Sequence, residues 1–311
     1  MELPGLLQPW GIAVPALVAL AAYFLAYRHY RRDPRRPQLH LDVAALALLA
    51  LLTGGFFWRV LTEGGIWMPA GGGDIASFYY PTYSYVASEI KNGAIPLWNP
   101  YIRSGMPLAA DVQTGLFYPI NWIMYLLFDV NYGTLEWLLI AHYWLASAFM
   151  YIFLRDTGLR RPGAVSGAVA FAFCGFMVAH FGHLPMIPAA TWIPLVLLSL
   201  RRAYVKQALT GWAWATATGL FLALSLLAGH VQIFSYGLLA AGVLWLFLLL
   251  ERRPRTARSV AGWVVKGLLA VAIALGIGAV QLLPSVELSG QSSRASVSYE
   301  EASEFPAQPI T

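Results

Sequence analysis

The chain has 311 residues, of which 59% are hydrophobic and 11% are charged, and its formal net charge is +5. Soluble domains are about 25% charged, so this composition excludes an ordinary soluble protein and indicates a polytopic membrane protein. The cations are not a nucleic-acid signal, because 15 of the 20 Lys and Arg residues fall in four short clusters, at 28–36, 155–161, 201–206 and 252–258, between long apolar segments. The single cysteine, Cys174, excludes a disulfide within the chain.

The apolar segments predict an all-α fold of about eight transmembrane helices, since a spanning helix needs about 20 apolar residues. Loops rich in Lys and Arg stay in the cytoplasm, so the four clusters place the N-terminus and the tail 284–311 outside. We therefore expect a multi-pass protein of the inner (cytoplasmic) membrane. The expected helices are 10–27, 41–61, 134–154, 163–181, 184–200, 210–228, 231–250 and 261–283.

Two segments test this assignment. Segment 184–200 is short and contains Pro185, Pro188 and Pro194, but the alternation of sides fails without it. Segment 116–128 is apolar yet has only about 13 residues, fewer than a span requires. Its Trp122 and Tyr125 suit the headgroup level, so we expect an interfacial or re-entrant helix there.

The stretch between the second and third expected helices, 62–133, is a long extracytoplasmic loop. Loops of this length without structure are uncommon and are usually functional or disordered. Its many aromatic residues, such as Tyr79, Tyr83 and Trp98, argue against disorder. We expect short interfacial helices in this loop, and we expect the function to reside there.

Asp74 follows three glycines at the start of this loop. A flexible glycine run lets the backbone approach a ligand closely, and a carboxylate at the membrane surface can act as a general base on a nearby hydroxyl. Two plainer interpretations are a solvated loop aspartate and an N-cap of the following helix, a position that Asp favours.

Asp111 lies beside the apolar segment that we expect to enter the interface, where a charge is costly without a partner or a use. Asp74 and Asp111 could share a divalent cation such as Mg²⁺ or Mn²⁺, or they could divide into a base and an orienting group. The alternative for Asp111 is a structural salt bridge with Arg103.

Four polar residues, His180, His183, His230 and Gln232, lie at the outer ends of expected helices. Without cysteine or a third nearby histidine, a zinc site is not favoured. The histidines could instead bind a phosphate, or they could hydrogen bond between helices. Outer cations are scarce, so an anionic lipid phosphate would have to use some of them; the candidates include Arg103 and Arg294.

Several sequence segments, taken together and in order, resemble the bacterial YfhO-like membrane proteins, which have the GT-C glycosyltransferase architecture. In the long loop they are GDIASFYYP at 73–81, NGAIPLWNPY at 92–101, SGMPL at 104–108 and QTGLFYPIN at 113–121. At the helix ends they are FCGF at 173–176, Gly182-His183, WIP at 192–194 and GHVQ at 229–232. The resemblance covers about residues 54–305.

This resemblance implies an enzyme that moves a sugar from a polyprenyl-phosphate donor to an extracytoplasmic cell-envelope glycan or glycolipid. It implies that Asp74 is the essential loop aspartate and that Asp111 is a second loop acid, although the match at Asp111 is looser. The chain departs from the usual GT-C pattern by an extra helix in front of the long loop. Family members are typically much longer, so the chain is expected to be an N-terminal portion or a short homologue.

An alternative from another class is a non-enzymatic transporter or flippase of lipid-linked saccharides, or an assembly partner. A transporter should carry polar residues at mid-membrane depth. The expected spans are nearly free of them, and the polar residues concentrate at one face. This distribution favours chemistry at the membrane surface.

Overall fold

The computed structural model describes residues 21, 23–25, 27–28, 38–63, 73–102, 104–206, 208–251 and 256–291. Within these ranges the chain is helical, and an isolated bridge between Asn99 and Met106 is its only β-type pairing. Among the described residues, six helical segments are long and apolar enough to cross a membrane. They are α2 (Leu39–Phe56), α6 (Tyr132–Asp156), α7 with α8 (Arg161–Ala179), α11 (Ala208–Leu227), α12 (Val231–Glu251) and α13 (Ala257–Gly290). The part of the chain that the structure describes is therefore all-helical, with the apolar helices of a multi-pass membrane protein.

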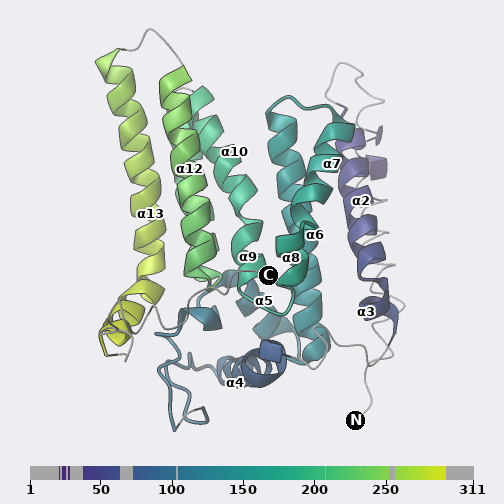
Figure 1. The fold of residues 1–311 in the computed structure, drawn as a ribbon, viewed down its shortest axis with the longest axis vertical. Coiled ribbons are helices and arrows are strands. Elements are labelled where there is room, and N and C mark those ends of the chain that lie inside the picture. The colour runs from purple at the N-terminus through teal and green to yellow at the C-terminus, as the bar shows by residue number, and fades with distance from the viewer. Residues whose placement is uncertain are drawn as a thin grey trace, which may run out of the picture.

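The helices run side by side between two ends of the molecule (Figure 1). On one side α6 packs against α2 and α7, and on the other α11 packs against α13 and against α10 (Ile193–Val205). The contact of α10 with α6 joins the two sides. The short helices α4 (Tyr80–Lys91) and α5 (Pro119–Leu127) lie across the lower end in the view of Figure 1. The lower end thus holds the described parts of the long loop. The expected helix 10–27 lies almost entirely outside the described residues.

Local sequence explains where several helices begin. The side chain of Asn131 accepts a hydrogen bond from the Thr134 amide, and the Thr134 hydroxyl accepts one from the Asn131 amide. This capping box satisfies amides that the first turn leaves without partners, so α6 starts two residues before the expected 134. The Thr256 side chain caps α13 by accepting a hydrogen bond from the Ser259 amide.

The expected helix 184–200 is interrupted in the structure. The chain forms α9 (Met186–Thr191) and α10, which are separated at Trp192. Pro194 has no amide hydrogen to donate to the preceding turn, which favours a break. A buried polar cluster stabilises the break, because the Trp192 indole donates to the Tyr118 hydroxyl over 2.9 Å and that hydroxyl lies 2.9 Å from Nε2 of His142.

Two other expected helices are also interrupted, and one is longer than expected. A break at Phe57 separates α2 from α3 (Trp58–Thr62), and a break at Phe173 and Cys174 separates α7 (Arg161–Ala172) from α8 (Gly175–Ala179). Helix α13 does not end at 283 but continues through Pro284 to Gly290. A proline inside a helix removes one backbone hydrogen bond, and the contacts that α13 makes with the long loop offset this loss. The expected tail is described only as far as residue 291.

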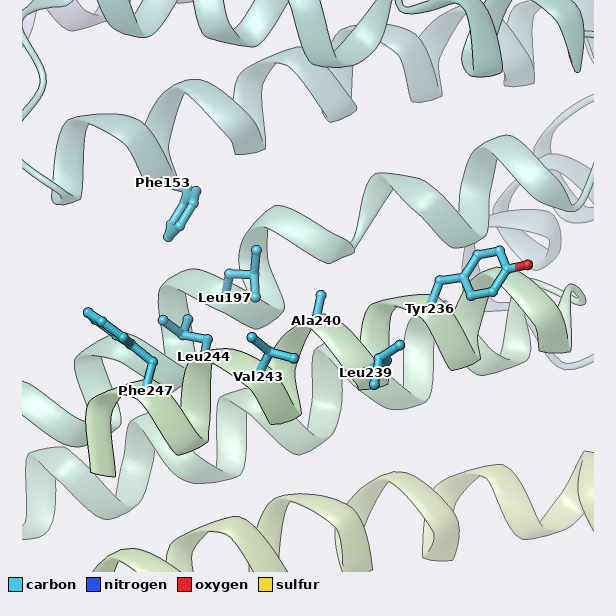
Figure 2. A pocket seen from close by; sticks show the side chains of 8 residues that line it. All are labelled: Phe153, Leu197, Tyr236, Leu239, Ala240, Val243, Leu244 and Phe247. Carbon is cyan, nitrogen blue, oxygen red and sulfur yellow. The ribbon is translucent and has the colours of Figure 1, made fainter. Parts of the chain in front are cut away.

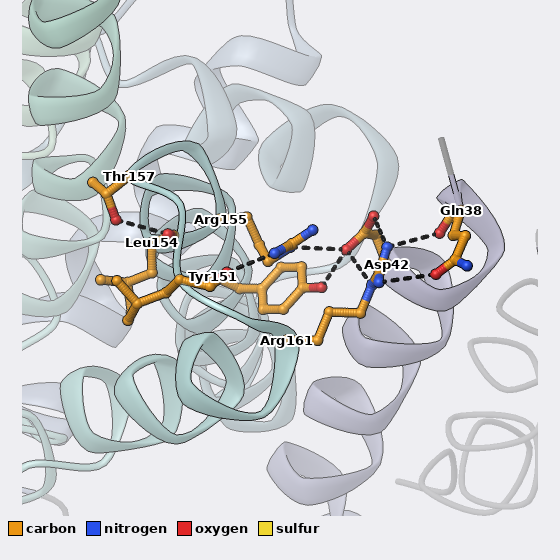
Figure 3. Close-up of polar contacts among 8 residues, drawn as sticks. Gln38, Asp42, Tyr151, Leu154, Arg155, Thr157 and Arg161 are labelled. Carbon is orange, nitrogen blue, oxygen red and sulfur yellow. Dashed lines mark hydrogen bonds and ion pairs between the residues drawn. The ribbon is translucent and has the colours of Figure 1, made fainter. Parts of the chain in front are cut away.

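The basic clusters at the upper end contain ion pairs between helices. Asp42 of α2 binds Arg161 of α7, with an Nε–Oδ1 distance of 2.9 Å, and it also binds Arg155 and the Tyr151 hydroxyl of α6 (Figure 3). Asp156 pairs with both Arg201 and Arg202 of α10. These arginines therefore fix neighbouring helix ends to one another, in addition to any effect on orientation in the membrane.

Helix α5 has nine residues and a length of about 14 Å, too short to cross a bilayer. Its Ile123 and Leu127 side chains are exposed, whereas Tyr125 is fully buried. Lys91 at the end of α4 pairs with Asp129 just beyond α5 over 2.8 Å, and this pairing lowers the pKa of the Asp129 carboxyl. The segment 116–128 thus contains a short helix, α5, at the lower end with an apolar outer face, as an interfacial helix requires.

Candidate functional site at the lower end of the bundle

Asp74 lies at the start of a helical segment but does not cap it. The residue precedes one turn of π-helix, η1 (Ile75–Tyr79), which continues directly into α4. Its side chain makes no capping hydrogen bond and is 58% exposed. The N-cap interpretation of Asp74 is therefore wrong. Single turns of π-helix often occur at functional sites, and this one fixes the position of Asp74 relative to the buried Tyr79.

His183 is the ionisable partner of Asp74. Its Nε2 lies 3.9 Å from Oδ2 of Asp74, and its side chain is 51% exposed. This distance is too long for a direct hydrogen bond but suits an ion pair when the imidazole is protonated. The two residues are far apart in the sequence, and His183 is held in the turn between α8 and α9, where its amide donates to the His180 carbonyl over 2.9 Å.

Two more histidines lie near this pair. The rings of His180 and His183 have centroids 5.3 Å apart, and Nδ1 of His180 lies 2.8 Å from the Phe176 carbonyl. His230 lies in the turn that precedes α12, and its Nδ1 accepts a hydrogen bond from the Ile233 amide. Partial burial lowers the pKa of His230, and the nearby His180 and His183 lower it further because like charges repel. The turns α8–α9 and α11–α12 thus bring three imidazoles together.

Asp111 has a local structural role, since its carboxylate accepts a hydrogen bond of 3.0 Å from the Gln113 amide and caps the short 3₁₀ helix η2 (Val112–Thr114). The charge of Asp111 also affects Tyr79. Burial raises the pKa of Tyr79, and the charges of both Asp74 and Asp111 raise it further. The two carboxylates therefore lie near the same buried tyrosine. The expected salt bridge with Arg103 falls outside the described residues.

The loop that carries Asp111 is fixed by α13. Gln281 is 1% exposed, and its Nε2 donates to the Ala109 carbonyl over 2.8 Å. The Ser285 hydroxyl lies 2.8 Å from the Ala110 carbonyl and 2.6 Å from the carbonyl of Gln281 in its own helix. Neither Gln281 nor Ser285 was among the site residues expected from the sequence. A glutamine inside an otherwise apolar span was the available signal, because a polar side chain there needs a partner or a use.

The turn between α11 and α12 packs on the same loop. Gly229 has a φ of +101°, and a Cβ placed there would lie 2.6 Å from the Val112 carbonyl oxygen. Only glycine fits this close approach at a positive φ. The backbone beside His230 is therefore in contact with the backbone beside Asp111.

The remaining expected site residues are not joined to this group by a described contact. Gln232 lies in the first turn of α12, and its amide donates to the Tyr236 hydroxyl over 2.7 Å. Arg103 and Arg294 lie outside the described residues. The structure thus brings Asp74, His183 and His230 together, with Asp111 close by and Gln232 just beyond His230.

The described residues contain no group of three or more His, Cys, Asp or Glu side chains that could hold a metal ion. The charges of Asp74 and Asp111 both act on Tyr79, from different segments of the long loop. Mg²⁺ is usually held by one or two carboxylates together with substrate phosphates, and Asp74 and Asp111 are the carboxylates that would hold such a cation here.

Open apolar cavities lie on the sides of the bundle, and two of them are defined by their lining residues. The larger, with a volume of about 650 Å³, lies between α6, α10 and α12. The smaller, of about 460 Å³, lies between α5, α11 and α13 and is lined by Phe117, Trp122 and Val280 among others.

Comparison with known proteins found no family model, no curated protein and no solved structure that matches this chain.

Proposed function

We propose that the protein is a membrane glycosyltransferase that moves a sugar from a polyprenyl-phosphate donor to a cell-envelope glycan or glycolipid, with the lower end of the bundle on the extracytoplasmic side of the inner membrane. The observation that carries the proposal is the Asp74–His183 pair, which is exposed at the lower end beside His180 and His230. The resemblance of the long loop to the YfhO-like proteins, and with them to the GT-C architecture, agrees with this location.

In the proposed reaction Asp74 accepts the proton of an acceptor hydroxyl. The hydroxyl oxygen attacks the anomeric carbon of the donor sugar as the bond from that carbon to the phosphate oxygen breaks. The polyprenyl phosphate leaves with the bonding electron pair, so no protein acid is needed on the leaving group. His183 and His230 would donate hydrogen bonds to the phosphate, because stabilisation of developing charge is usually a large contribution to catalysis.

The distribution of ionisable residues favours surface chemistry over transport. In the described helices, ion pairs of Asp42 and Asp156 lie at the upper end, and the Asp74–His183 pair lies at the lower end. Of the charged residues within spanning helices, Lys266 of α13 donates to the Ala203 carbonyl of α10, and Glu136 lies in the first turns of α6. His142, inside α6, hydrogen bonds with Tyr118 and with the Leu138 carbonyl. A transport path should instead carry charged or polar residues through the middle of the membrane.

The test is a transfer assay with the protein in lipid nanodiscs, polyprenyl-phosphate sugars as donors and envelope lipids as acceptors. Loss of a general base typically costs about 10²–10⁴ in rate, so Asp74→Asn should lose at least about a hundredfold while still binding the donor. Asp129→Asn is the matched control, because Asp129 is an exposed carboxylate at the same end that pairs with Lys91. A fully active Asp74→Asn protein, or translocation of donor without transfer, would overturn the proposal.

A further inference from the structure

The larger apolar cavity is an open groove along one face of α12, here called the α12 groove (Figure 2). Its floor is a stripe of α12 residues that includes Tyr236, Ala240, Val243 and Phe247. Leu197 of α10 and Phe153 of α6 complete the lining. Apart from the Tyr236 hydroxyl the lining side chains are hydrocarbon, so the groove suits a hydrocarbon occupant.

Helical geometry gives the groove its direction. Residues spaced by three, four and seven positions share one helix face, so the stripe from Tyr236 to Phe247 runs parallel to the helix axis. At 1.5 Å per residue it is about 17 Å long, roughly half of the hydrocarbon thickness of a bilayer. Ala240 is the smallest side chain in the lining. Its small size leaves room between Tyr236 and Phe247 for a chain that lies along the helix.

The groove changes from apolar to polar toward the candidate site. At its lower end the Tyr236 hydroxyl accepts a hydrogen bond from Gln232, one turn closer to the start of α12. His230 comes immediately before the helix and lies near His180 and His183. A molecule that fills the groove and reaches its lower end would therefore need a hydrocarbon chain and a polar head that accepts hydrogen bonds from amide and imidazole N–H groups. This is the chemistry of a phosphorylated single-chain lipid.

We propose that the α12 groove holds the isoprenoid chain of a polyprenyl phosphate whose phosphate lies beside Gln232 and His230. The inference rests on the proposed function and deepens it, because it assigns the donor lipid to one side of the bundle. The groove favours long isoprenoid chains, since each additional methylene that it buries adds to the free energy of binding. Polyprenyl phosphates with long chains then bind better than geranyl phosphate, whose chain fills less of the groove.

The first experiment is photolabelling of the wild-type protein in phosphatidylcholine nanodiscs. The probe is a long-chain polyprenyl phosphate with a diazirine on its isoprenoid chain, and labelled peptides are mapped by mass spectrometry. Label is expected on α12 between Tyr236 and Phe247 and on the peptide with Leu197. Unlabelled undecaprenyl phosphate should displace it, and geranyl phosphate or phosphatidylglycerol should not. Label elsewhere, or equal displacement by phosphatidylglycerol, overturns the proposal.

The second experiment fills the groove by mutation. Ala240→Trp should reduce labelling and raise the KM for a long-chain donor about tenfold or more, because it excludes several carbons of the chain. Gly242→Trp is the matched control, since it adds a larger side chain on the same helix where a Cβ would meet no atom within 4 Å. Equal effects of the two variants, or no effect of Ala240→Trp, would contradict the proposal.

The two experiments distinguish failure of the groove proposal from failure of the proposed function. If the wild-type protein transfers no sugar but the probe labels the α12 groove with the expected competition, the proposed function fails and the groove stands. If transfer occurs but labelling and KM do not respond to Ala240→Trp, the groove fails and the function stands.

Discussion

Ser285 on α13 lies 2.8 Å, measured from its hydroxyl oxygen, from the carbonyl of Ala110, the residue before Asp111. Together with Gln281, which donates to the Ala109 carbonyl, it joins the last turns of a membrane-spanning helix to the long loop. A buried hydrogen bond contributes about 1 kcal/mol net, and a carbonyl left unpaired costs more. The Ser285–Ala110 hydrogen bond therefore has an effect beyond its own free energy, because it restrains the backbone that positions Asp111.

The first prediction concerns this bond. Ser285→Ala should lower the free energy of unfolding by about 1 kcal/mol and should speed amide exchange in the loop around Asp111. Thermal unfolding in detergent and hydrogen–deuterium exchange measure the two effects. Ser235→Ala is the control, because the exposed Ser235 hydroxyl bonds only the Val231 carbonyl of its own helix. Unchanged exchange around Asp111 in Ser285→Ala would show that α13 does not restrain the loop.

The second prediction concerns Gly229. Gly229→Ala combines backbone strain at positive φ with a clash against the Val112 carbonyl. Strain of this kind costs about 1–3 kcal/mol, and the clash adds to it. Gly158→Ala is the control, because Gly158 also has a positive φ, of +97°, but nothing lies within 4 Å of its added Cβ. The melting temperature should fall further for Gly229→Ala, and equal falls would indicate that the two turns do not pack tightly.

The third prediction concerns topology. In a Cys174→Ser background, Thr157→Cys and Lys206→Cys should react only with membrane-permeant thiol reagents, because they lie in basic clusters. Ala94→Cys and Gly290→Cys, which belong to the lower end, should react with impermeant reagents added to intact cells. Since all four positions are exposed, failure to react reflects sidedness and not burial. Labelling of Thr157→Cys from outside would invert the proposed orientation and place the candidate site in the cytoplasm.

The fourth prediction concerns pH. The pKa of His230 is lowered in the folded protein, so the unfolded chain binds the proton first as pH falls. The stability that His230 contributes is therefore fully present above its ordinary pKa of about 6.5 and is lost as pH falls through the lowered folded pKa. His230→Gln should reduce the loss of thermal stability between neutral and mildly acidic pH.

The control for this measurement is Gln232→Ala, a neighbouring change that removes no titrating group and should keep the wild-type pH dependence. His180 and His183 remain in both variants, so the difference between the variants reports on His230. If His230→Gln loses as much stability on acidification as the wild type, the lowered pKa of His230 does not account for the acid-induced loss of stability.

Sequence by itself determined which segments are helical and apolar. A run of about 20 apolar residues is a local property, and it located α6, α11 and α12 to within two residues at each end. The length of segment 116–128 likewise indicated a helix too short to span. The two Gly-His turns placed His183 and His230 at one end of the bundle, since helices of similar length that alternate in direction return their turns to the same level.

Only the tertiary structure decided what meets at that level. Asp74 and His183 are separated by more than 100 positions, and Ser285 and Ala110 by 175. No periodicity in the sequence encodes such pairs, because they depend on how the loop folds back over the helix ends. At the break at Trp192 the local effect of Pro194 is joined by a tertiary contact, because the Trp192 indole reaches the buried Tyr118, which local propensity cannot register. Hydrophobic patterning sets the helices, and side-chain packing between distant segments sets the site.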